Sequence, residues 1–336
     1  MSAPIAERLR GIHAATITPM TDDFRVDEAA LERHVAAVAG TPGIRGLLVN
    51  GHAGENFVLD AGEKRRALEI AVAAAPPDRL ICAGINAESS LDAAREAAGA
   101  EAAGAHILLV FPPNSWALGH DGACADIHHR HVLAATSLPV LLYGAPIGAG
   151  SMAYDADTLE RLADEPRIVG IKDGSWEVAA YEEHRRRLLA LRPDFAVMGS
   201  GDEHLLTSYI IGSHGSQVSL AAIIPELLAR FYDRTQAGDW SGARALHDAI
   251  YPLSVAIYRD APGGRATARI KACLHRLGRI PSAAVRPPQP PVTALEIHAL
   301  EAALRHAGLL GKEGAEHGPS GTFPAADARM EAAVPR

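Results

Sequence analysis

Short apolar runs alternate along the chain with longer segments whose apolar residues recur at helical spacing. The short runs are rich in Val, Ile, Leu and Ala, which is typical of buried strands. They cover eight segments, 13–18, 44–50, 79–85, 106–111, 139–145, 167–173, 195–200 and 215–220. Segments rich in Ala, Leu, Glu and Arg separate most of them, and their spacing predicts amphipathic helices at 28–39, 61–74, 90–104 and 155–165.

This alternation predicts an α/β fold with a parallel sheet covered by helices. Near-continuous apolar strands, repeated roughly every 25 to 35 residues, are typical of strands buried on both faces. Eight strand–helix units are the number that closes a (β/α)8 TIM barrel. A doubly wound open sheet is the alternative. It is less favoured because no Gly-x-Gly-x-x-Gly pattern follows the first predicted strand.

The pattern changes after the eighth predicted strand. Residues 224–310 contain helical spacing without further strands, interrupted by a Pro-rich connection at 281–291. Residues 311–336 mix Gly, Pro, Ala and charged residues without periodicity, which predicts a disordered tail. We therefore expect a barrel over 1–223 and a helical domain over 224–310.

Composition narrows the class of protein. The 336 residues suffice for a large core, and the formal net charge of −8 argues against a nucleic-acid partner. The apolar runs are too short to cross a bilayer, and residues 1–11 lack the apolar stretch of a signal peptide. The three cysteines are far apart without Cys-x-x-Cys spacing, as expected for reduced thiols. These features predict a cytoplasmic protein that does not associate with membranes.

One lysine has an unusual context. The chain contains only Lys64, Lys172, Lys271 and Lys312, and three of these fall in predicted helices or the tail, where surface cations are expected. Lys172 alone lies in an apolar strand. A desolvated amine there would lose basicity and could form an imine with a ketone. The alternative is a structural ion pair with Asp173 or another buried acid.

Tyr143 ends the apolar run that precedes the lysine run. In a barrel, these two strands are neighbours, and both side chains would reach the carboxyl ends of the strands, where barrel enzymes place their chemistry. A phenol there can relay protons. The alternative is a core or rim tyrosine with a satisfied hydroxyl.

Three other strand ends carry candidate substrate-binding residues. The segment 49–57 contains a tight glycine-rich turn, whose backbone amides could hold a small carboxylate. The segment 199–203 offers acidic side chains for substrate hydroxyls, and the last predicted strand offers a hydroxyl. The candidates are Gly51, His52, Ala53, Gly201, Asp202 and Ser219. The alternatives are ordinary glycine-rich connections, with Glu55 entering a helix and Asp202 capping one.

The histidines do not predict a metal site. His52, His120, His128, His129 and His131 lack His-x-x-x-His spacing on a well-defined helix with an acidic third ligand. We expect them to be solvated, and we expect no metal and no cofactor.

Together, these motifs resemble the dihydrodipicolinate synthase / N-acetylneuraminate lyase superfamily over about residues 10–310. The resemblance rests on Thr18-Pro19, the Gly-x-x-Gly-Glu turn at 51–55, Tyr143, the Gly-Ile-Lys-Asp segment at 170–173 and the segment 199–203. It implies a (β/α)8 barrel with a C-terminal helical domain, a homotetramer or dimer, and a Schiff base between Lys172 and pyruvate or another 2-keto acid. It further implies Tyr143 as general acid/base and the turn at 51–55 as the carboxylate pocket.

The departures from the family pattern concern the second substrate. His52 and Ala53 replace the two hydroxyl residues of the family turn, and Gly148 stands where the family arginine binds the aldehyde's carboxylate. The sequence from Phe111 to Asn114 lacks the family tyrosines. These changes argue against dihydrodipicolinate synthase activity and favour an aldolase or dehydratase for another 2-keto acid or keto-deoxy sugar acid. His52 is a candidate for the missing proton relay. The alternatives are a non-catalytic keto-acid or sugar-acid binding protein and a true dihydrodipicolinate synthase.

Overall fold

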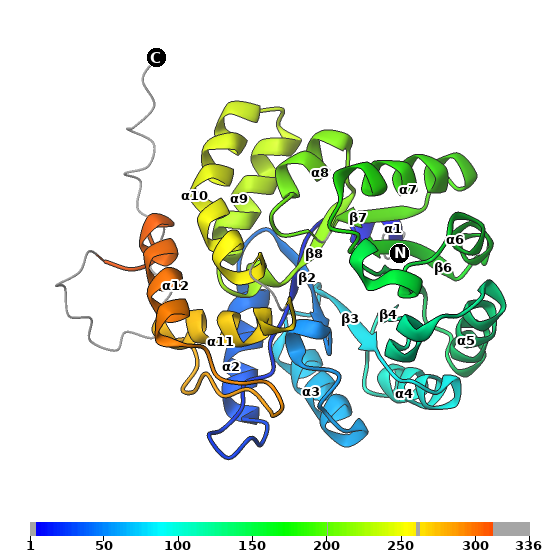
Figure 1. The fold of residues 1–336 in the computed structure, drawn as a ribbon, viewed down its shortest axis with the longest axis horizontal. Coiled ribbons are helices and arrows are strands. Elements are labelled where there is room, and N and C mark those ends of the chain that lie inside the picture. The colour runs from blue at the N-terminus through cyan, green and yellow to red at the C-terminus, as the bar shows by residue number, and fades with distance from the viewer. Residues whose placement is uncertain (1–4, 200, 260–262, 312–336) are drawn as a thin grey trace.

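The computed structural model describes residues 5–199, 201–259 and 263–311, and its centre is a closed barrel of eight parallel strands in chain order (Figure 1). β8 pairs with β1, which closes the barrel and confirms the predicted (β/α)8 fold. The strands are β1 (Gly11–Ala15), β2 (Ile44–Val49), β3 (Leu80–Ile85), β4 (Ile107–Val110), β5 (Val140–Gly144), β6 (Ile168–Asp173), β7 (Ala196–Gly199) and β8 (Gly215–Val218).

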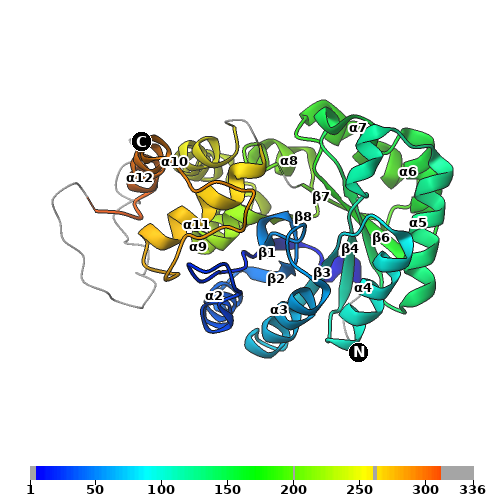
Figure 2. The same ribbon diagram turned by 60° about the horizontal axis from the view of Figure 1, so that its bottom comes forward.

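The helices that alternate with these strands cover the outside of the barrel (Figures 1 and 2). A short helix, α1 (Ile5–Arg8), precedes β1. The covering helices are α2 (Glu28–Gly40), α3 (Ala61–Ala74), α4 (Ser90–Ala102), α5 (Gly122–Ala135), α6 (Ala156–Ala163), α7 (Val178–Leu191) and α8 (Leu205–Ile211). Aspartate side chains cap the N-termini of several of these helices. For α3, Asp60 and Glu63 form a capping box with bonds of 2.8 and 3.0 Å.

Apolar side chains pack on both sides of the barrel wall. The larger cluster fills the space between the strands and the helices, and a smaller one fills the interior, where it includes Leu48, Cys82, Leu109, Tyr143 and Met198. Burial on both faces explains why the strands read as continuous apolar runs rather than as alternating patterns. The three cysteines are free thiols.

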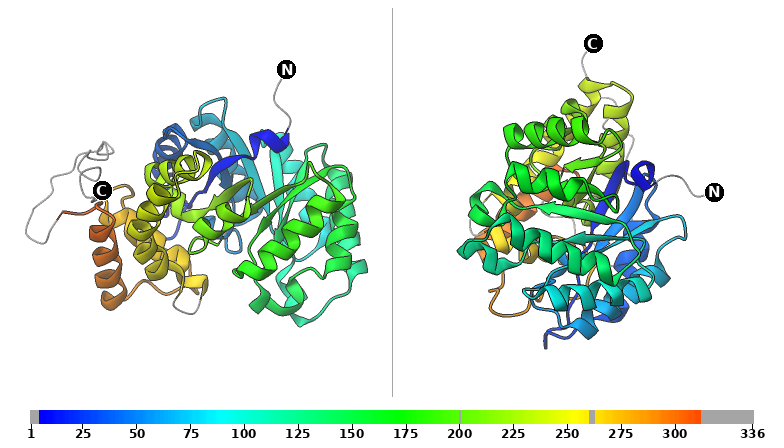
Figure 3. Two further views of the ribbon diagram at one scale, coloured as in Figure 1. Left: turned by 90° about the horizontal axis from the view of Figure 1, so that it is seen from above. Right: turned by 90° about the vertical axis from the view of Figure 1, so that its right-hand side faces the viewer.

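Within the described residues, four α-helices follow β8 and the short 3₁₀ helix η4 (Ser219–Ala222), and Figure 3 shows the last of them at one end of the molecule. They are α9 (Pro225–Gln236), α10 (Trp240–Tyr258), α11 (Ala266–Arg276) and α12 (Ala294–His306). α9 packs against β1 and α10, and α10, α11 and α12 pack on one another. The C-terminal helical region is thus present, while the boundary at 223/224 stays a prediction. Residues 312–336 of the predicted tail lie outside the described residues.

Within the described residues, no helix combines the length and the apolar character needed to span a membrane.

The expectation that Lys64 and Lys271 are surface cations is wrong. Lys64 is buried, and its Nζ lies 2.6 Å from Glu96 and donates to the Asn86 carbonyl at 2.9 Å. Lys271 is fully buried and pairs with Glu55. Each ammonium therefore meets a carboxylate supplied by a segment distant in sequence, and local helical spacing carries no sign of such a partner. Lys312 lies outside the described residues.

Candidate active site

The β5–β6 register brings together the two residues predicted to carry the chemistry. Tyr143 and Lys172 are paired in the parallel ladder. Side chains at paired positions of adjacent parallel strands project to the same face, and here that face is the barrel interior. The Lys172 Nζ lies 5.7 Å from the centroid of the Tyr143 ring. The two side chains are therefore neighbours at the carboxyl end of the barrel.

The environment of Lys172 favours its neutral amine. Burial removes water from the ammonium group and lowers the Lys172 pKa from 10.5 to about 8, against the opposing negative charge of Asp202. The next residue, Asp173, accepts from the Ser175 amide at 2.9 Å and lies 2.7 Å from His184 Nδ1. A pKa near 8 gives a useful fraction of nucleophilic amine at neutral pH.

Tyr143 is held as a neutral phenol. Burial raises its pKa, and the nearby charges of Asp173 and Asp202 act in the same direction. Its ring packs against Phe111 with centroids 4.6 Å apart. Gly174 leaves room for the hydroxyl, because a Cβ at that position would lie 3.0 Å from the phenolic oxygen. The side chain is thus fixed in place with a proton to donate.

The predicted carboxylate-binding turn follows β2. It contains the 3₁₀ helix η1 (His52–Gly54), closed by bonds from the Gly54 amide to the Gly51 carbonyl and from the Glu55 amide to the His52 carbonyl, both 3.0 Å. The Thr18 hydroxyl donates to the Gly54 carbonyl at 2.9 Å, so the residue of the Thr-Pro motif braces the turn from β1's side. Among the described residues, the amides of His52 and Ala53 find no acceptor.

His52 stacks within an aromatic group at the carboxyl end of the barrel. Its ring centroid lies 4.3 Å from that of Phe111 and 5.3 Å from that of Tyr143. Burial, aided by the positive charge of Lys172, lowers the His52 pKa to about 3. The imidazole is therefore uncharged at neutral pH and has no extra proton to give.

Gly201, Asp202 and Ser219 lie together after β7 and β8. The Asp202 Oδ1 accepts from the Leu220 amide at 2.9 Å and from the Tyr258 hydroxyl at 3.0 Å. The Tyr258 hydroxyl also lies 2.7 Å from the Ser219 Oγ. Burial raises the Asp202 pKa to about 6, although both hydrogen bonds and Lys172 oppose the rise.

Sequence reasoning missed Tyr258. It lies on α10, in the helical region, and no motif links it to residues 201–202. Its hydroxyl reaches the site only because α10 folds back against the carboxyl end of the barrel.

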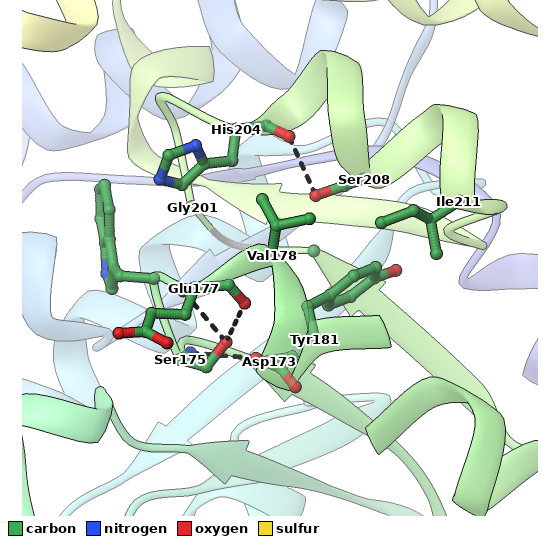
Figure 4. A pocket seen from close by; sticks show the side chains of 11 residues that line it. Asp173, Ser175, Glu177, Val178, Tyr181, Gly201, His204, Ser208 and Ile211 are labelled. Carbon is green, nitrogen blue, oxygen red and sulfur yellow. Dashed lines mark hydrogen bonds between the residues drawn. The ribbon is translucent and has the colours of Figure 1, made fainter. Parts of the chain in front are cut away.

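A small cavity lies beside this site, between β6 and β7 and the helices α7 and α8 (Figure 4). Asp173, Ser175, Tyr181 and His204 are among the residues that line it. Its volume of ≈ 20 Å³ holds about one water molecule, which is too little for a keto acid. The barrel mouth around Lys172 therefore remains the candidate site.

Three of the positions at which the sequence departs from the family pattern are Phe111, Gly148 and Asn114. The first two carry neither a cation nor a phenol. Phe111 adds its ring to the wall beside Tyr143, and Gly148 lies in the 3₁₀ helix η3 (Ile147–Met152) with no atom within 4 Å of where a Cβ would stand. At the third, the Asn114 amide donates to Glu88 at 2.9 Å.

The described residues contain no group of three or more His, Cys, Asp or Glu side chains able to hold a metal ion. The expectation that the histidines are solvated is wrong for two of them. His128 and His129 are buried on α5, where His128 Nδ1 lies 3.1 Å from the Ser90 hydroxyl and His129 Nε2 lies 3.2 Å from the Tyr154 hydroxyl. Both rings are covered by side chains of neighbouring segments, since Trp116 also packs against the ring of His128 and Tyr154 against that of His129.

Comparisons with known proteins agree with the geometry. The model of the "Dihydrodipicolinate synthetase family" matches residues 8–307. A 4-hydroxy-tetrahydrodipicolinate synthase from Methylobacterium radiotolerans is 30% identical over 310 residues, which are 92% of this chain and 99% of the relative. A dihydrodipicolinate synthase structure from Agrobacterium tumefaciens superimposes with a TM-score of 0.78 at 28% identity, covering 90% of this chain and all of the other. YagE, a prophage protein from Escherichia coli K12 solved with pyruvate, has a TM-score of 0.82 at 23% identity over 90% of this chain and 99% of its own, and shows the same fold.

Proposed function

This chain belongs to the dihydrodipicolinate synthetase family, and we propose that it is a class I lyase whose Lys172 forms a Schiff base with pyruvate or a related 2-keto acid. The observation that carries the proposal is the pairing of the partly buried Lys172 with Tyr143 across β5 and β6. The prediction of a pyruvate-type lyase agrees with this membership. Dihydrodipicolinate synthase activity itself stays an alternative.

The first steps use the two neighbouring side chains. The neutral Lys172 amine attacks the C2 carbonyl, the carbonyl oxygen takes up a proton, and the resulting carbinolamine loses water to give a protonated imine. This imine accepts the electron pair released when a C3–C4 bond breaks, or when C3 loses a proton before a C–O bond breaks. Tyr143 donates and recovers the protons, since it is a neutral phenol beside the amine.

The turn at 51–55 supplies the binding site for the keto-acid carboxylate. The free amides of His52 and Ala53 are suitable donors for its oxygens, and Gly51 opens the turn. Backbone donors do not need the hydroxyl residues that the family has at these two positions. This explains how the site can bind a keto acid without them.

The far end of the substrate would meet Gly201, Asp202 and Ser219. A carboxylate and a hydroxyl at this place suit the hydroxyl groups of a keto-deoxy sugar acid better than a second carboxylate. The open position at Gly148 also favours a sugar acid over a substrate with a second carboxylate, because Gly148 has no guanidinium to pair with a carboxylate.

Condensation of pyruvate with aspartate semialdehyde is therefore expected to be negligible. A coupled assay of pyruvate consumption with this aldehyde, run against a screen of keto-deoxy sugar acids read by pyruvate release or by dehydration, measures the difference. Efficient turnover of aspartate semialdehyde would contradict our interpretation of Gly148 and Asn114, and would identify a true dihydrodipicolinate synthase.

The same screen separates the enzyme from a non-catalytic binding protein. The missing hydroxyls of the turn favour that alternative, since they remove part of the family's proton relay. A binding protein would form the imine, trapped by borohydride, without releasing product from any keto acid.

Homo-oligomerisation and a cytoplasmic location stay predictions, and a monomeric dihydrodipicolinate synthase variant is among the structural relatives.

The pH dependence of imine formation follows from the Lys172 pKa of about 8. Only the neutral amine attacks, and its fraction grows as the pH rises through this value. At subsaturating pyruvate, the rate of adduct formation is expected to rise about tenfold per pH unit below pH 7 and to level off above about pH 8. Samples reacted at each pH and then quenched into borohydride at one fixed pH give the rates. A rate that still climbs steeply at pH 10 would indicate an ordinary solvated lysine.

A further inference from the structure

The turn at 51–55 is tied to the helical region by a buried ion pair. Lys271, on α11, contacts the Glu55 carboxylate, and the two side chains are 0% and 3% exposed. The Lys271 Nζ also donates to the Ala284 carbonyl at 2.9 Å, and the other Glu55 oxygen accepts from the Arg286 amide at 3.1 Å. The Lys271 ammonium and the Glu55 carboxylate are thus each paired with the other and hydrogen-bonded to a backbone group from the segment 284–286.

Glu55 needs such a partner because of its backbone. Its φ of 60° and ψ of 36° place it in the left-handed region, which a residue with a side chain adopts only when its surroundings hold it there. This conformation ends η1 and directs the chain toward α3. If the carboxylate were released, no side-chain contact of Glu55 would oppose the strain of this conformation, and only backbone bonds such as that from the Glu55 amide to the His52 carbonyl would hold the turn.

The same face of α11 holds the turn at its other end. Thr267 precedes Lys271 by one helical turn, and its hydroxyl donates to the His52 carbonyl at 3.3 Å. Figure 2 shows α11 between α12 and the barrel, in the position that these contacts require. One helix thus contacts the residue that begins η1 and the residue that follows it.

We propose that Lys271 is a positioning residue for the keto-acid site, acting through Glu55 on the turn whose amides bind the carboxylate. This inference rests on the proposed function of that turn. Lys271 has two effects there. It fixes the left-handed Glu55, and its positive charge cancels a buried carboxylate that would otherwise repel the substrate's own carboxylate from the same turn.

The test compares Lys271→Met, Glu55→Gln and the double variant in full-length protein. Pyruvate is titrated in borohydride trapping, which gives a half-saturating concentration and a rate at saturation. We expect Lys271→Met to raise the half-saturating concentration by about tenfold or more, because it leaves the Glu55 charge uncompensated beside the bound anion. The rate at saturation is expected to stay within about threefold, since Lys172 and Tyr143 are untouched.

The double variant keeps the test decisive if Lys271→Met fails to fold. It leaves no unpaired charge in the interior, so it is expected to fold, and it still lacks the contact that holds the turn. Its half-saturating concentration should lie between the wild-type and Lys271→Met values, about threefold or more above wild type. A folded double variant with the wild-type value would overturn the proposal.

Lys64→Met is the matched control. Lys64 is also a buried lysine paired with a carboxylate, but its partner is Glu96 on α4, and its ammonium does not contact the turn. Its half-saturating concentration should equal that of the wild type, even if the protein becomes less stable. An equal rise in both variants would show a general loss of stability rather than positioning, and would also overturn the proposal.

Amide hydrogen exchange distinguishes a failure of this inference from a failure of the proposed function. Peptides covering 50–58 should exchange faster in Lys271→Met than in wild type and at the wild-type rate in Lys64→Met, whether or not pyruvate binds. If the wild type forms no adduct, the proposed function is contradicted. The exchange result still tests whether Lys271 holds the turn at 51–55. If exchange in 50–58 is unchanged, the positioning role of Lys271 is contradicted.

Discussion

Lys172→Ala is expected to abolish the borohydride-stable adduct with pyruvate completely. The adduct is the reduced form of an imine, and an imine needs a primary amine at the reacting carbonyl. Within the described residues, the other two lysines, Lys64 and Lys271, have their ammonium groups bound to Glu96 and Glu55. Lys172 is left as the lysine beside Tyr143 at the barrel mouth. Incubation with pyruvate and borohydride, followed by peptide mass analysis, measures one adduct on the peptide that contains Lys172.

The controls for this prediction distinguish chemistry from folding. Lys64→Met removes another buried lysine and should label like the wild type. Lys172→Ala should unfold at a temperature no lower than that of the wild type, because burial disfavours the ammonium that it removes. An adduct that persists in folded Lys172→Ala would reject the assignment of the nucleophile.

The fold was predictable because each strand of this barrel is buried on both faces. All eight predicted runs overlap an observed strand, and seven contain it entirely, since a parallel strand inside two layers must be apolar throughout its length. The largest difference is at the first strand, predicted at 13–18 and observed at Gly11–Ala15. Ile17 is buried without being in a strand, because the chain turns across the barrel end there, and Thr18 bonds to the turn after β2.

The pair Lys172 and Tyr143 was predictable for a related reason. Both end adjacent apolar runs, and consecutive strands of a barrel are neighbours, so proximity in sequence order becomes proximity in space. Tyr258 and Lys271 had no such signal. They lie on helices after the barrel, and their partners Asp202 and Glu55 belong to β-strand connections far earlier in the chain. Such contacts depend on how α10 and α11 dock, which hydrophobic periodicity does not specify.

Tyr143→Phe is expected to lower turnover by roughly 10²- to 10⁴-fold, the usual contribution of a positioned acid/base group. The ring and its packing against Phe111 remain, so pyruvate should still bind and the imine should still form and be trapped, although more slowly than in the wild type. The loss should appear in kcat for the keto acid that the substrate screen identifies. His52→Ala should be mild by comparison, because a pKa of about 3 leaves His52 uncharged and unable to act as the proton donor at neutral pH.

Tyr154→Phe is a matched control for the lost hydroxyl. Tyr154 is also a buried phenol, but its hydroxyl contacts His129 beneath α5 rather than the site, so its removal should leave turnover unchanged. The opposite ranking, with His52→Ala severe and Tyr143→Phe mild in proteins of wild-type thermal stability, would assign the relay to the imidazole that replaces a family hydroxyl. We favour Tyr143, because the ladder that pairs it with Lys172 places a neutral phenol beside the amine. His52 packs against Phe111 and Tyr143, and its low pKa leaves the imidazole without an extra proton to donate.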